Sequence, residues 1–216
     1  MIHQVANPHA TGTRSNWLYK VSATASLILG WLLVAAAIQL VVTVLYPATT
    51  GWLTLLQHNW LVVIFNLHAG FSNVQSSPFY QMNLLDLAIL ALAATMYIGL
   101  YMALRKTGKV LPLIALAQPI LGMVLFVVTK TAGRSSFMGA ELVISLVMLR
   151  SKLFDKWIAF AGLLSAILLL AGDLGASLAP SDILAIVMGT GYTLSVVWLF
   201  LVGTRLLQLA RDNELE

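Results

Sequence analysis

The chain contains no cysteine and few charged residues. The absence of cysteine from all 216 residues excludes disulfides, iron–sulfur clusters, thiolate zinc sites and thiol nucleophiles. Charged side chains make up 9% of the sequence, against about 25% in ordinary soluble domains, whereas hydrophobic residues reach 60%. A soluble fold of this length could not bury so much apolar surface. The composition therefore predicts an all-α integral membrane protein, with room for roughly five to seven crossings of about 20 residues each.

Several functional signatures are also absent. The sequence has no His-Glu-x-x-His, Gly-x-Ser-x-Gly or phosphate-loop pattern, so we assign no catalytic residues and no metal site. The net charge of +4 comes from short basic clusters at the ends of apolar segments rather than from a basic stripe interleaved with aromatic residues. We therefore expect no nucleic-acid partner.

The four histidines are poorly placed to hold a haem. His58 and His68 lie ten positions apart in one segment, which puts them about 80° out of alignment on a regular helix, and His3 and His9 lie near the N-terminus. We therefore predict no haem and no other cofactor.

The N-terminal region combines basic residues with a long apolar run. Arg14 and Lys20 precede the run, and small residues near Ala36 resemble a signal-peptide cleavage site. Because apolar residues continue as far as Leu45, we predict an uncleaved first crossing. Residues 1–16 are expected to form a polar tail.

Apolar stretches predict six crossings within a single transmembrane domain over residues 17–209, followed by a charged tail over 210–216. The crossings are expected at about 17–46, 81–104, 110–128, 136–149, 157–172 and 183–207. The short linkers between the later crossings predict sequential antiparallel neighbours in one polytopic helix bundle.

Residues 52–67 are the hardest segment to assign. No Lys, Arg, Asp or Glu occurs from Val21 to Leu85, yet this segment is too polar for an easy crossing. It could cross the bilayer, or it could form an interfacial or re-entrant helix with Trp52 and Trp60 at the level of the lipid headgroups.

The positions of the basic residues favour the second alternative. If 52–67 does not cross, ten basic residues fall on one side of the membrane and only Lys130 and Arg134 on the other, as the positive-inside rule requires. The ten are Arg14, Lys20, Arg105, Lys106, Lys109, Arg150, Lys152, Lys156, Arg205 and Arg211. We therefore expect six crossings of a bacterial cytoplasmic membrane, with both termini in the cytoplasm.

Two acidic residues occur inside predicted crossings, where a carboxylate costs about 2.5–3.5 kcal/mol. Asp86 lies early in the second crossing and Glu141 in the short fourth one, both near the external side. Lys130 and Arg134 flank an expected turn over residues 131–133 on that side. At about 1.5 Å per residue, both carboxylates lie within roughly 10 Å of the external surface, a depth that long basic side chains can reach.

This shared depth predicts an external polar cluster. Its members are Asp86, Lys130, Arg134, Glu141 and Asp173, with His58 or His68 at the rim. Two interpretations stay open: ion pairs that only let the bundle close, or a site for a ligand or a proton.

Two stretches resemble the uncharacterised bacterial multi-pass membrane proteins of the domain of unknown function 4386 family. The first contains Asp86, Ala94-Thr95-Met96-Tyr97, Leu100-Tyr101 and Leu104-Arg105-Lys106, and the second runs from Lys156-Trp157 into Ala161-Gly162-Leu163. In that family a second crossing often carries an early acidic residue, and a later one opens with a basic residue before a central glycine. The resemblance implies six crossings and no assigned activity.

Three functions compete at this stage. The missing catalytic motifs and the uncharged segment favour a non-catalytic or accessory subunit that binds other membrane subunits within the lipid bilayer. The alternative is a transporter, channel or small-molecule binder that uses Asp86 and Glu141, since a lone carboxylate in a low dielectric can exchange a proton. The third is an intramembrane enzyme acting on a lipid or quinone, with His58 or His68 as its base.

Overall fold

The computed structural model describes residues 9–45, 84–105, 107–108, 110–128, 130–178 and 182–215. Within these ranges the chain consists of helices and short connections without a strand, which confirms the all-α part of the predicted fold class. The described helices are α1 (His9–Leu45), α4 (Leu84–Leu104), α5 (Val110–Val128), α6 (Lys130–Arg150), α7 (Lys156–Leu178) and α8 (Asp182–Leu215). The segment 52–67 lies outside the described residues.

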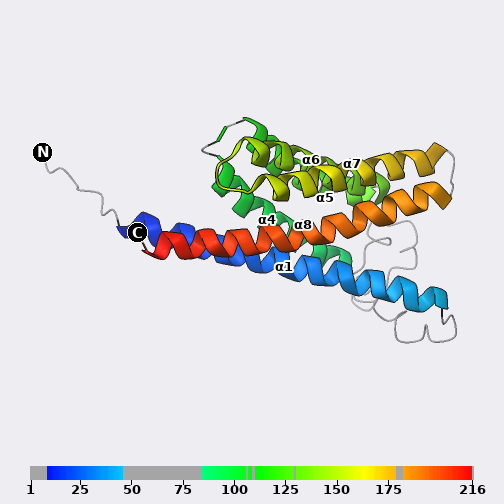
Figure 1. Ribbon diagram of the computed structural model, residues 1–216, viewed down its shortest axis with the longest axis horizontal. Coiled ribbons are helices and arrows are strands. Elements are labelled where there is room, and N and C mark those ends of the chain that lie inside the picture. Colours follow the sequence, from blue (N-terminus) through cyan, green and yellow to red (C-terminus); the bar gives the residue numbers. More distant parts are fainter. Residues whose placement is uncertain are drawn as a thin grey trace, which may run out of the picture.

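The described helices pack as a closed ring in which neighbours in sequence are neighbours in space. Figure 1 shows this bundle from the side, with its helices running lengthwise. From α4 to α8 each helix packs against the next, and α1 closes the ring by packing against both α4 and α8. This arrangement agrees with the prediction of sequential neighbours. Such packing buries one face of each helix and leaves the opposite face exposed.

Helices α1 and α4 run in opposite directions. The Ser22 hydroxyl of α1 donates a hydrogen bond to the carbonyl oxygen of Thr95 in α4 at 2.8 Å. One turn earlier on α1, Tyr19 lies near Arg105, which follows the end of α4. An earlier residue of α1 therefore lies beside a later residue of α4, so the two helices are antiparallel. The end of α1 and the start of α4 lie at the same end of the bundle.

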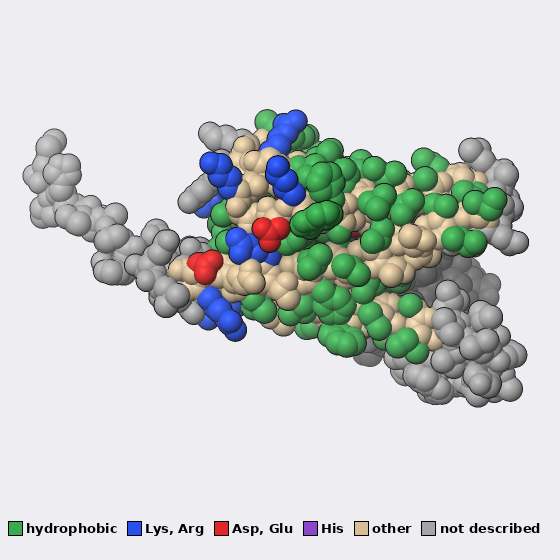
Figure 2. Space-filling view, in the orientation of Figure 1, with side chains coloured by type: hydrophobic (Ala, Val, Ile, Leu, Met, Phe, Trp, Pro, Cys, Tyr) green, Lys and Arg blue, Asp and Glu red, His purple; other side chains and the backbone are tan. Residues whose placement is uncertain are grey.

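Three helices are long and apolar enough to cross a bilayer. Their apolar stretches are Asn16–Ala35 in α1, Lys156–Gly175 in α7 and Ile186–Asp212 in α8. Shorter apolar stretches, Ala88–Leu104 and Val110–Gly122, lie in α4 and α5. Hydrophobic side chains also cover much of the outward face of the bundle in Figure 2. Helical backbones suit this environment because every internal N–H and C=O group is paired within the helix.

The described basic side chains gather at one end of the bundle, at the left of Figure 2. They are Lys20, Arg105, Arg150, Lys152, Lys156, Arg205 and Arg211. This end holds the beginnings of α1 and α7 and the ends of α4, α6 and α8.

Several helices extend beyond the apolar stretches that predict them. α1 begins at His9 rather than near residue 17, and α8 continues to Leu215. Hydropathy marks only the part of a helix that lies in lipid, whereas the intrahelical hydrogen bonds can continue into water. Parts of both predicted polar tails are therefore helical.

Helix α6 differs most from its prediction. The expected turn over residues 131–133 is wrong, because these residues belong to the beginning of a continuous 21-residue helix. A glycine such as Gly133 is a turn signal in soluble proteins, but membrane helices tolerate glycine more often. Glu141 consequently lies near the middle of α6, about 16 Å along the axis from Lys130 and about 13 Å from Arg150.

Candidate functional site

Glu141 is enclosed at the centre of the bundle. Its side chain is 6% exposed, and among the described residues no other charged side chain is buried. The rest of the core around it consists of aliphatic, aromatic and small side chains, with Trp198 of α8 the largest that is fully buried. A carboxyl group at this position is the strongest departure from apolar packing in the described part of the molecule.

Hydroxyl groups from two other helices surround this carboxyl group. The Ser195 hydroxyl of α8 donates a hydrogen bond to Glu141 Oε2 at 3.2 Å. Ser165 of α7 lies within reach of the carboxyl group but also donates to the carbonyl oxygen of Gly191 at 3.0 Å. Tyr97 of α4 is buried nearby. Glu141 Oε1 has no hydrogen-bond partner.

Two further buried polar atoms without partners lie about one helical turn beyond Glu141 on α6 and beyond Ser195 on α8. These are Ser145 Oγ, one turn after Glu141 on α6, and Trp198 Nε1. A Cβ atom added at Gly162 of α7 would overlap both, so the hydroxyl and the indole N–H lie against the same glycine. We call Glu141, Ser145, Ser165, Ser195 and Trp198 the Glu141 layer.

The Glu141 layer offers unpaired groups of complementary kinds. The carboxylate oxygen is an acceptor, the indole N–H is a donor, and the Ser145 hydroxyl can act as either. A buried polar group left without a partner costs about 1–3 kcal/mol, and such groups are rare enough to need an explanation. Grouped together, they suit a proton or a small polar solute. The described side chains include no group of three metal-ligating residues.

Asp173, another predicted site residue, lies nearer the end opposite the basic cluster. The half-buried Asp173 near the end of α7 accepts a hydrogen bond at 2.9 Å from the Ser135 hydroxyl near the start of α6. Glu141 is six residues further along α6, or about 9 Å deeper. The structure therefore places Glu141 and Asp173 at different depths, and the two carboxyl groups have different hydrogen-bond partners.

For the remaining members of the predicted cluster, the structure gives only their place on the chain. Asp86 lies in the first turn of α4, and Lys130 and Arg134 lie near the start of α6, but their side chains are outside the described part of the molecule. His58 and His68 lie outside the described residues. The cluster that joins these groups stays a prediction.

Sequence reasoning identified Glu141 but missed the residues that surround it. Serines recur within the apolar stretches of α6, α7 and α8, and Ser145 is one helical turn from Glu141. This spacing could have indicated which hydroxyl groups lie near the carboxyl group. Trp198 was a second signal, because it lies in the middle of an apolar stretch, whereas tryptophans of membrane proteins are enriched at the interfaces.

No family model, curated protein or solved structure matches this chain. The resemblance to the domain of unknown function 4386 family stays a prediction, and the argument for function rests on the geometry of the Glu141 layer.

Proposed function

We propose that this chain is a transporter or small-molecule binder that exchanges a proton at Glu141. The observation that carries the proposal is the buried Glu141 Oε1, which has no partner although two unpaired polar atoms lie in the same layer. A bundle that needed only to pack would be at least as stable with apolar side chains of similar volume at these positions. Intramembrane ionisable groups commonly mark proton relays and solute pathways.

The chemistry around Glu141 favours exchange of a proton over a permanent ion pair. Its nearest polar neighbours are neutral hydroxyl groups, and none of the described Lys or Arg side chains pairs with it. Without a neighbouring cation, the carboxylate is costly in the membrane, and uptake of a proton removes that cost. Protonation also gives the carboxyl group a donor, which changes the solutes it can bind.

We propose six crossings with both ends of the chain in the cytoplasm. The opposite directions of α1 and α4 support an even number of crossings, and the start of α1 shares one end of the bundle with the end of α8. The seven described basic side chains at that end support its cytoplasmic orientation. α6 adds a helix about 31 Å long, the thickness of a typical hydrocarbon core.

The two other hypotheses make separate predictions. An accessory subunit would co-purify with other membrane proteins in mild detergent. An enzyme with His58 or His68 as its base would depend on residues outside the described part of the chain. No described contact favours either hypothesis over the transporter or binder.

The proposed function can be tested with Glu141→Gln. Glutamine keeps the size of the side chain and its capacity to accept a hydrogen bond from Ser195, but it cannot exchange a proton. We expect vesicles containing the native protein and an internal pH-sensitive dye to take up protons under an imposed potential. Glu141→Gln should reduce this flux to that of protein-free vesicles.

Asp155→Asn provides the matched control because it removes a carboxylate from the exposed loop between α6 and α7. This variant should keep the native flux. A hydrophobic carbodiimide, which reacts with protonated carboxyl groups, should block the flux and modify Glu141. Equal flux in the native protein and Glu141→Gln, or no flux in the native protein, would contradict the proposal.

A further inference from the structure

The loop between α6 and α7, residues 151–155, is held firmly against the bundle. Phe154 is buried in the hydrophobic core. Arg205 Nε of α8 donates a hydrogen bond to the carbonyl oxygen of Leu153 at 2.7 Å, and the Leu153 N–H donates to Ser151 Oγ at 3.0 Å. These contacts fix the loop, so the side chains it presents to the outside are held in a defined arrangement.

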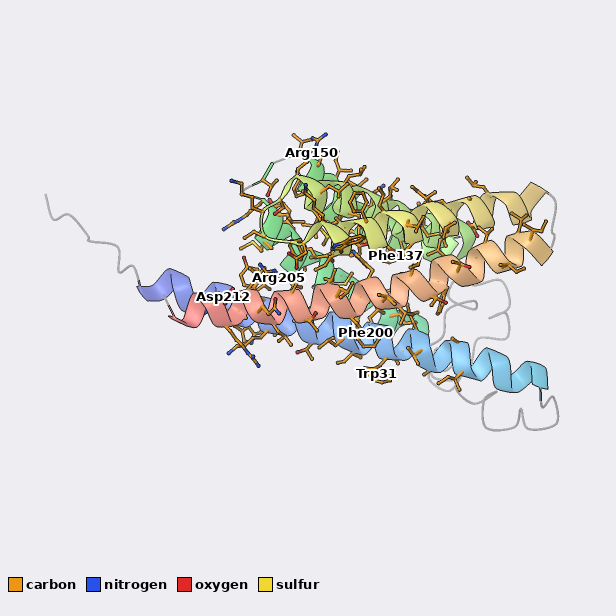
Figure 3. The ribbon with its side chains drawn as sticks, viewed as in Figure 1. Trp31, Phe137, Arg150, Phe200, Arg205 and Asp212 are labelled. Atoms are coloured by element: carbon orange, nitrogen blue, oxygen red, sulfur yellow. The ribbon has the colours of Figure 1, made fainter. Side chains whose placement is uncertain are left out.

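Exposed basic side chains surround this fixed loop. Arg150 ends α6, Lys152 lies within the loop and Lys156 begins α7, and all three are exposed. Asp155 is the single acidic residue between Arg150 and Lys156, which leaves an excess of positive charge. Figure 3 shows Arg150 at the outer edge of the bundle.

An exposed apolar stripe continues from these cations along α7. It begins with Trp157, whose side chain is 82% exposed, and continues through Phe160, Leu164 and Ile167. The spacing of three, four and three residues places these side chains on one face of the helix. Tryptophan is favoured at the headgroup level of a bilayer, and the aliphatic residues beyond it are suited to the acyl-chain region.

We propose that this surface, formed by Arg150, Lys152, Lys156 and the Trp157–Ile167 stripe, binds an anionic phospholipid. The basic side chains bind the phosphate and the negatively charged headgroup, while an acyl chain lies along Phe160 and Leu164. The cations around the loop adjoin the apolar stripe of α7, and together they match the two parts of an amphiphile, which neither a nucleic acid nor an acidic peptide would match. The loop is already fixed by Phe154 and Arg205, so binding requires little ordering of the protein.

The test compares the intact native protein with the double variant Lys152→Gln and Lys156→Gln. Native mass spectrometry would measure the binding of phosphatidylglycerol and of phosphatidylcholine to the detergent-purified chains. We expect phosphatidylglycerol to bind the double variant roughly tenfold to thirtyfold more weakly, from the attraction that each basic residue contributes near an anionic headgroup. Binding of phosphatidylcholine should change little.

The matched control is Arg105→Gln with Arg211→Gln, which removes the same charge from the same end of the bundle. This control should retain phosphatidylglycerol binding within about threefold, because Debye screening limits the reach of distant charges. An equal loss in both double variants would show diffuse attraction instead of a site and would overturn the proposal. Equally strong competition by soluble glycerol phosphate would identify an anion site without a lipid requirement and would also overturn it.

Discussion

At the level of single residues, Glu141 was predictable from the sequence and its surroundings were not. A lone carboxylate in an apolar stretch can be recognised without a structure because its transfer into lipid is costly. Its partners depend on how α6, α7 and α8 are rotated and shifted relative to one another. Nothing local in the sequence shows that Ser195, 54 residues away, points at the carboxyl group.

Substitution of Gly162 should destabilise the Glu141 layer. In Gly162→Ala the new methyl group would overlap Ser145 and Trp198, so we expect a loss of about 1–3 kcal/mol in the free energy of unfolding. Thermal and denaturant unfolding in detergent would measure the change. The matched control, Gly189→Ala, places a methyl group in open space and should be neutral or stabilising by up to about 1 kcal/mol. Equal destabilisation by both substitutions would contradict this packing.

Trp198→Phe separates the stability of the layer from its proposed function. Phenylalanine keeps an aromatic ring but removes the buried indole N–H that has no partner. Because this removes an unsatisfied group, we expect the free energy of unfolding to fall by less than about 1.5 kcal/mol despite the smaller ring. Proton flux in vesicles should fall at least tenfold if the N–H belongs to the site. A variant that keeps full flux would exclude Trp198 from it.

At the level of helices, the sequence predicted the interiors better than the ends. Apolar runs locate α4 and α5 closely, since both begin and end next to charged or polar segments. The start of α6 was missed because Lys130 and Arg134 mark the limit of an apolar segment in the sequence, although the helix continues through both residues. This error made the predicted helix too short and placed Glu141 near its beginning instead of near the middle of α6.

Arg205 should stabilise the connection between α6 and α7. It donates hydrogen bonds to the Leu153 carbonyl oxygen and to Gln208 Oε1, and Figure 3 shows it at the basic end of α8. We expect Arg205→Met to lower the free energy of unfolding by about 1–2 kcal/mol, because the Leu153 bond is charge-assisted and partly buried.

Hydrogen exchange would locate this effect. In Arg205→Met, amides of residues 151–156 should exchange faster, while those in the middle of α4 should keep their protection. Arg211→Met is the control because Arg211 is exposed near the end of α8. Faster exchange in both variants would show that Arg205 has no special role in holding the loop.

At the level of the whole molecule, composition predicted the all-α character that the described residues show, and short linkers predicted which helices are neighbours. The closure of the ring by α1 and α8 was not predictable, because it depends on small residues that fit one another. Ser26 donates a hydrogen bond to the carbonyl oxygen of Leu199 at 2.7 Å, and Gly203 lies against Leu27. Trp31 also packs edge-on against Phe200, as Figure 3 shows.

The absence of cysteine permits a direct test of the proposed orientation. Single substitutions Asp155→Cys and Asp212→Cys place a thiol at the basic end, whereas Ile183→Cys places one at the exposed start of α8. In intact bacterial cells, a membrane-impermeant maleimide should label Ile183→Cys alone, and all three variants should be labelled after the cells are opened. Labelling of Asp155→Cys in intact cells would reverse or refute the orientation.

The ring also has a consequence for biosynthesis. Helices α4 to α8 each meet a partner as soon as the next helix is made, but α1 and α8 are joined by distant contacts such as the Ser26–Leu199 hydrogen bond, between residues 173 positions apart. Helix α1 must therefore keep the face that packs against α8 uncovered until α8 is made. The small residues Ala23, Ser26 and Gly30 of α1 belong to that face. A nascent chain that ends before α8 would leave this face of α1 open to quality-control proteases.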